Sequence, residues 1–217
     1  MHTLQFFKTK KAATSVIGSL SDTSKMPGKS WGISASLCNT GRKLAKIDGT
    51  VCSDCYACKG SYAMYPAVKK AHATRIDAWR DDRLSWCQAM VDLIGSETHF
   101  RWFDSGDLQS SDMLRDILSI AARTPNTRHW IATREVSYVR DAIEGKTIPD
   151  NVVIRMSASF PDSAHVPGGK LTGNIALVHK NSASIGFKCP APDQGNSCGN
   201  CRACWDKSVK AVSYKSH

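Results

Sequence analysis

The chain has no apolar run long enough to cross a membrane, and its first residues lack the long apolar core of a secretion signal. We therefore expect an intracellular, cytoplasmic protein with no membrane partner. Cysteines in a reducing compartment are thiols or metal ligands rather than disulphides. The odd number of cysteines, nine, also weighs against complete pairing.

Familiar hydrolytic motifs are missing as well. There is no G-x-S-x-G nucleophile elbow and no H-E-x-x-H zinc motif. The G-K-S at residues 28–30 lacks the upstream glycine of a phosphate-binding loop, so no such loop is predicted there. His129 lies in an apolar run and is predicted to be a hydrogen-bonded core histidine. Catalytic residues therefore cannot be named from motifs.

An unusual pattern of cysteines is present instead. Eight of the nine fall into two sets, each made of one distant thiol and a C-x2-C-x2-C triplet. The front set is Cys38, Cys52, Cys55 and Cys58, and the rear set is Cys189, Cys198, Cys201 and Cys204. This spacing is close to the cysteine run of bacterial ferredoxins, so we expect one or two 4Fe-4S clusters. Structural zinc and a disulphide framework are the alternatives.

The composition describes an ordinary globular protein with an excess of basic residues. Hydrophobic residues make up 41% of the chain, and the formal net charge is +10. Such a charge favours nucleic acid as a partner, although a solvated basic surface without a specific partner explains it equally well. Cys87 lies in a stretch with helical periodicity and is predicted to be a buried helix cysteine.

Strand-like and helix-like segments alternate through the middle of the chain. Four apolar runs, at residues 99–107, 128–134, 151–159 and 174–180, read as strands, with helical patterns at 110–123 and 135–146 between them. Helices are also predicted from Pro66 to Arg80 and from Asp82 to Ile94, and a helix-free loop at 161–173.

This alternation predicts an α/β fold: a partial, open β/α barrel with a parallel sheet and a cysteine-rich, cluster-binding C-terminal tail. We expect one globular unit, with the barrel and its cysteine loop at residues 1–185 and the tail at 186–217.

Polar residues close each predicted strand. Because ligands bind beyond the carboxyl ends of parallel strands, we expect a pocket there. Its predicted cofactor-binding residues are Asp104, Ser105, Asp107, Arg134, Ser157 and His179. The carboxylates are expected to bind an amine of the ligand, Arg134 to bind a carboxylate or phosphate, and the hydroxyls to orient the ligand. His72, on the helix after the front cysteines, is predicted to be a surface histidine.

Several motifs together carry a family resemblance. From about Lys25 to the end, the chain resembles the phage Gene product 88 family through M-P-G-K-S-W, C-Y-A-x-K-G, the S-G-D after a strand and C-x2-C-x2-C-W. The resemblance implies a phage origin and a cluster, in the host cytoplasm, more than an activity. The fourth position of C-Y-A-x-K-G, which Cys58 occupies here, varies in that family. The resemblance therefore does not require Cys58 as a ligand.

The front half also resembles radical S-adenosylmethionine proteins, in which three cysteines hold a 4Fe-4S cluster with one iron open to the methionine part of the cofactor. The spacing here departs from their C-x3-C-x2-C, and no G-G-E follows the next strand, where residues 104–107 stand instead. Without Cys58, the front set would leave one iron open. The resemblance implies an oxidoreductase that carries out redox or radical chemistry, and the basic net charge alone suggests a nucleotide or nucleic-acid-related substrate. The alternative is a non-catalytic protein, stabilised by zinc or clusters, that binds nucleic acid or a host protein.

Overall fold

The computed structural model describes residues 7–216. All seven strands of its one sheet are parallel, in the order β1-β2-β3-β4-β5-β7-β6. The strands are β1 (Ser30–Trp31), β2 (His99–Trp102), β3 (Arg128–Thr133), β4 (Val152–Ser157), β5 (Ile175–His179), β6 (Phe187–Lys188) and β7 (Ala211–Lys215). Strands β1 and β6 are the two edges, so the sheet stays open rather than closing into a barrel. The predicted α/β fold with an open, parallel β/α arrangement is confirmed.

Helices fill the connections between the strands. They are α1 (Lys10–Ile17), α2 (Asn39–Leu44), α3 (Gly60–Met64), α4 (Pro66–Asp81), α5 (Arg83–Ile94), α6 (Ser111–Arg123), α7 (Val136–Ile143) and α8 (Gly169–Thr172), with the 3-10 turns η1 (Ala35–Leu37), η2 (Tyr56–Cys58), η3 (Ala191–Asp193) and η4 (Ala203–Trp205). Pro66 opens α4, and the side chains of Asp82 and Ser110 cap α5 and α6. The long helices therefore begin where the sequence predicts. Within the described residues, no helix is both long and apolar enough to cross a bilayer.

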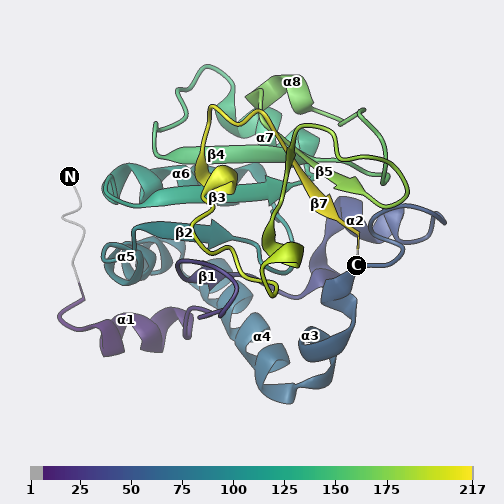
Figure 1. Cartoon of the computed structure of the whole chain (residues 1–217). Coiled ribbons are helices and arrows are strands. Elements are labelled where there is room, and N and C mark those ends of the chain that lie inside the picture. The colour runs from purple at the N-terminus through teal and green to yellow at the C-terminus, as the bar shows by residue number, and fades with distance from the viewer. Residues whose placement is uncertain (1–6, 217) are drawn as a thin grey trace.

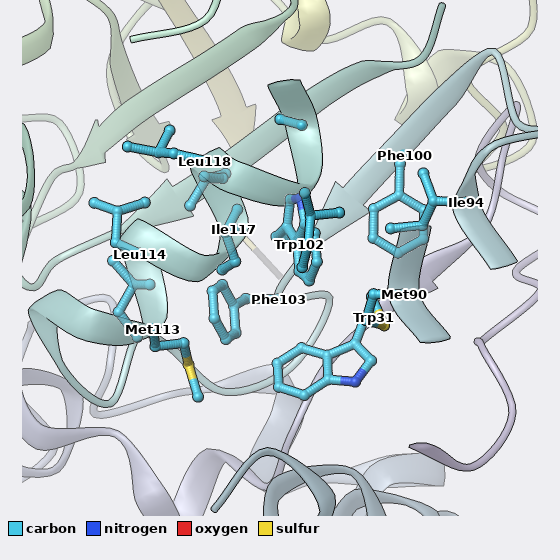
Figure 2. Close-up of a cluster of buried hydrophobic side chains, with 14 of the residues drawn as sticks. Trp31, Met90, Ile94, Phe100, Trp102, Phe103, Met113, Leu114, Ile117 and Leu118 are labelled. Atoms are coloured by element: carbon cyan, nitrogen blue, oxygen red, sulfur yellow. The ribbon is translucent and has the colours of Figure 1, made fainter. Parts of the chain in front are cut away.

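One face of the sheet carries the main hydrophobic core. Side chains at alternate positions of β3 and β4, such as Ile131 and Ile154, pack with the apolar faces of α5, α6 and α7. Trp31 of β1 contacts Trp102 of β2 and the following Phe103 edge to face, and the ring centroids lie 6.0 Å and 5.7 Å apart (Figure 2). His129 is fully buried and lies within hydrogen-bonding distance of Trp102 and Thr124, as predicted.

The C-terminal segment covers the other face. Figure 1 shows it, green to yellow, crossing the sheet before it ends as β7. There Trp205 and Cys204 pack on Trp130 of β3. The side chain of Arg155, on β4, is completely buried and donates to the carbonyl oxygens of Cys204, Ala203, Asp206 and Val209 at 2.8–3.1 Å. A buried guanidinium thus ties the tail to the sheet through backbone oxygens.

Four features of the fold depart from the sequence prediction or lie outside it. Strand β1 ends at Trp31, and the chain then turns into η1; Gly32, between them, lies so close to Asp104 that no Cβ fits. The loop at 161–173 contains the single turn α8, which begins and ends at left-handed glycines. His72 is only 4% exposed, because its ring stacks on Tyr62, so the surface prediction was wrong. The tail also supplies strands β6 and β7, which its cysteine-rich sequence conceals.

We predict that Arg155→Met lowers the free energy of unfolding by roughly 3 kcal/mol, because several buried carbonyl oxygens lose their donor. Urea denaturation followed by tryptophan fluorescence measures the change. Arg128→Met, at an exposed position on β3, is the matched control and should stay within about 0.5 kcal/mol of the original chain. Equal effects of the two substitutions would show that Arg155 does not hold the tail.

Candidate metal centres

The four front thiols gather beside the N-terminus of α2. Cys38 precedes α2, and nearby Cys55 and Cys52 contribute to the raised pKa of its thiol, after burial and the carboxylate of Asp107. A methyl group added at Gly41 would lie 3.7 Å from the sulphur atoms of both Cys38 and Cys52. Cys58 interacts with Cys55 and Cys52 but is exposed, unlike the other three. The distant thiol and the triplet therefore share one site.

Hydrogen bonds fasten this cysteine loop to the carboxyl ends of three strands. Buried Glu135, after β3, accepts from the amide and the hydroxyl of Thr40, both at 2.8 Å. The amide of Val51 donates to the carbonyl of Ser159 after β4, at 2.9 Å. The Tyr56 hydroxyl donates to the carbonyl of Asp104 after β2, at 2.6 Å. Figure 1 shows α2 at this end of the sheet, where the arrowheads of β5 and β7 also point.

Acidic groups lie next to the front thiols. Asp107 is 5% exposed and accepts from the Thr133 hydroxyl at 2.6 Å and from the Arg134 amide at 3.0 Å. Burial raises the pKa of Asp107 to about 6 in spite of these hydrogen bonds. Burial also raises the pKa of the Cys52 thiol, and Arg134 works against this rise. Four thiolates here would repel one another and the carboxylates, so a bound cation is the natural compensation.

The bend after β2 is strained and holds buried polar groups. Phe103 has φ of 60°, and Gly106 has φ of 80° and packs so closely on Ile33 that no Cβ fits. Asp104 is 3% exposed; one of its carboxylate oxygens is 3.2 Å from the Tyr62 hydroxyl, and the other has no hydrogen-bond partner among the described residues. The Ser105 hydroxyl has no partner among them either. This D-S-G-D bend lies directly under the cysteine loop.

The rear thiols form a second group, on the tail side of the sheet. Burial and the neighbouring Cys189 and Cys201 raise the pKa of Cys198, while Lys25 lowers it. Burial raises the pKa of Cys204 to about 11, and its sulphur lies 3.1 Å from the Tyr214 hydroxyl. Here too the distant thiol and the triplet meet.

Both groups have the donors that an iron–sulphur cluster or a zinc ion requires. All nine cysteines are free thiols. Each set offers four sulphur atoms, and Gly41 leaves the space between α2 and the front sulphurs clear. Within residues 7–216, no three His, Cys, Asp or Glu side chains are placed to hold a single metal ion as they stand. The donor atoms therefore fit either an iron–sulphur cluster or a zinc ion bound by thiolates.

A cavity of about 360 Å³ opens next to the front thiols. Arg134, Arg140, three serines and Thr40 line it, together with Val136 and Pro167; the serines are Ser137, Ser157 and Ser159. A second cavity of about 240 Å³ lies along α2, between Cys38 and the basic residues Arg42, Lys43 and Lys46. The surroundings of the front thiols are therefore rich in arginine and lysine.

The six predicted pocket residues separate into three places. Arg134 and Ser157 line the larger cavity, and Asp107 lies next to Cys38. Asp104 and Ser105 are buried under the cysteine loop. His179 lies apart from them, with its Nδ1 2.8 Å from the hydroxyl of Ser213 on β7.

Sequence reasoning missed Thr40, Glu135 and Arg140. Glu135 directly follows a predicted strand end, so the strand-end rule could have found it. Thr40 and Arg140 carry no such signal, because only the folded chain brings α2 and α7 together at this cavity.

The fold and the thiols together define an open, parallel β/α protein with two four-cysteine sites. The family model described as Gene product 88 matches residues 4–207, and the chain belongs to this phage family. No curated protein and no solved structure matches the chain.

We predict that a short bifunctional thiol reagent joins cysteines only within each set when metal-free protein is treated anaerobically. Peptide mapping by mass spectrometry should show a Cys38–Cys52 link and no Cys38–Cys198 link. Protein unfolded in urea is the control and should give mixed links. Frequent links between the two sets in the folded protein would contradict the grouping.

Proposed function

We propose that this protein is an iron–sulphur protein with a reactive 4Fe-4S cluster at the front thiols and a second cluster at the rear thiols. Two groups of four thiols, each assembled from distant parts of the chain, are the observation that carries the proposal. Consecutive C-x2-C-x2-C triplets suit the corners of a cluster better than a single tetrahedral ion.

The front site is the proposed reactive site because of where it lies. It is fastened to the carboxyl ends of the strands, which is where β/α proteins bind their ligands. It also adjoins the larger cavity, whose lining includes Thr40, two residues from Cys38. The exposure of Cys58 supports a front cluster held by Cys38, Cys52 and Cys55, with one iron open to S-adenosylmethionine. When bound together, these groups supply one-electron redox and radical chemistry.

The chain's own residues would bind and orient the substrate. Arg134 and Ser157 line the cavity and can hold an anionic substrate beside the thiols. Asp107 fixes Arg134 through its backbone amide, at 3.0 Å.

In this proposal the rear cluster exchanges electrons with the front one. Tyr56, next to Cys55, lies 3.4 Å from a guanidinium nitrogen of Arg101. Arg101 stacks on Trp130 at 4.6 Å, and the Trp130 ring stacks on Tyr214 at 6.3 Å between centroids. Tyr214 reaches Cys204. This series of contacts supports an electron-relay role, beside the structural role of fixing the tail.

We predict that anaerobically purified protein is brown, absorbs broadly near 400 nm and contains stoichiometric iron and sulphide. The double variants Cys52→Ser/Cys55→Ser and Cys198→Ser/Cys201→Ser should each lose about half of the iron. Cys87→Ser, which removes a cysteine outside both sets, is the control and should keep all of it. Colourless protein that contains zinc would reject the proposal in favour of a non-catalytic, zinc-stabilised protein that binds nucleic acid or a host protein.

A further prediction concerns the open iron. Adding S-adenosylmethionine to the reduced protein should change its electron paramagnetic resonance spectrum, and Cys58→Ser should keep both the front cluster and this response. Cys38→Ser should lose both, because Cys38 is one of the three proposed ligands. An unchanged spectrum in the original chain would count against an open iron.

A further inference from the structure

The larger cavity has a lining suited to anions. It is bounded by two arginines, four hydroxyl-bearing residues, one valine and one proline, and no carboxylate lines it. Its volume of about 360 Å³ lies at the small end of the range for small-molecule sites, roughly 300–1,000 Å³. The cavity can therefore hold a ligand larger than a single phosphate ion.

Neither arginine is neutralised by an ion pair within residues 7–216. Arg140 is exposed and makes no salt bridge or hydrogen bond there through its side chain. Arg134 uses only its Nε, which donates to the carbonyl of Ala158 at 3.1 Å. The two guanidinium groups keep unused donors for an anion, and two such forks match the three oxygens of a phosphate better than a single carboxylate.

Ser157 and helix α7 add further donors. Ser157 is 8% exposed, lines the cavity, and makes no side-chain hydrogen bond within the described chain. Ser137 lies in the first turn of α7, and Glu135 at the N-cap makes no side-chain bond to the amides of that turn. A hydroxyl that lines the cavity without a hydrogen-bond partner and an uncapped helix start both favour a bound anion.

The nearby carboxylates are occupied elsewhere. Glu135 is held by Thr40, and Asp107 by Thr133 and the Arg134 amide. No carboxylate in the lining therefore competes with a ligand for the guanidinium groups of the two arginines. Two arginines and no acid in the lining suit a ligand with more negative charge than the single carboxylate of S-adenosylmethionine, so the ligand that we propose here is a second, anionic molecule.

From this geometry we infer that the cavity binds the phosphate group of a small phosphomonoester, such as a nucleoside monophosphate. The inference deepens the proposed function, because it names the substrate class of the same site. Arg134 and Arg140 hold the phosphate, Ser157 and Ser137 donate to its oxygens, and the rest of the molecule extends toward the front thiols. The phosphate site requires no metal of its own.

Isothermal titration of the full-length, as-purified protein with nucleoside monophosphates and inorganic phosphate tests the inference. We expect both to bind and the matching nucleosides not to bind. Arg140→Gln should weaken binding roughly tenfold or more, as expected for the loss of a charged hydrogen-bond donor. Ser157→Ala should weaken it less. Arg128→Gln, which removes the same charge at the opposite end of β3, should leave binding within about twofold.

Several results would overturn the inference: equal binding by Arg140→Gln, equal binding of nucleosides and nucleotides, or tight binding of a single-stranded oligonucleotide only, unaffected by Arg140→Gln. Iron measured in the same samples separates the two proposals. Iron-loaded protein that does not bind nucleoside monophosphates or inorganic phosphate would reject only the phosphate site. Iron-free protein that binds phosphates through Arg140 rejects only the cluster.

Discussion

The structure depends on gathering thiols at sites where thiolates would repel one another. Burial and neighbouring thiols raise the pKa of Cys38, and Asp107 and Glu135 add to the rise. The arrangement is stable with neutral thiols, or with thiolates neutralised by a cationic centre. Metal binding and the closure of the cysteine loop onto β2, β3 and β4 are therefore expected to support each other.

The rear thiols show the same coupling on the other face of the sheet. Buried Arg155 holds the backbone around Cys204, and Trp205 donates its Nε1 hydrogen to the carbonyl of Phe100 at 2.9 Å. The tail then continues into β7, which lies between β5 and β6. Occupying the rear thiols would add to the aromatic contacts, the Arg155 guanidinium and the pairing of β7 with β5, which already hold this layer on the sheet.

Between the two thiol groups, the sheet brings aromatic and arginine side chains into contact. Trp130 packs against Trp205 and Tyr214 of the tail. It also packs against Arg101, which lies next to Tyr56 of the front cysteine loop. A substitution there would alter packing and communication together. The larger cavity lies away from this path, at the start of α7, so the proposed phosphate binding and the proposed electron relay would use separate residues.

Strands β2 to β5, helices α4 to α7 and the pairing of each triplet with a distant cysteine were readable from the sequence, because they depend on periodicity and spacing. Strand β7 and the buried position of His72 were not, because both depend on partners far away in the chain. The larger cavity belongs to the second kind: Arg140 and Thr40 become neighbours of Ser157 only when α7 and α2 pack at the same sheet end. Local chemistry thus determined which groups the protein carries, and long-range packing decided which of them meet.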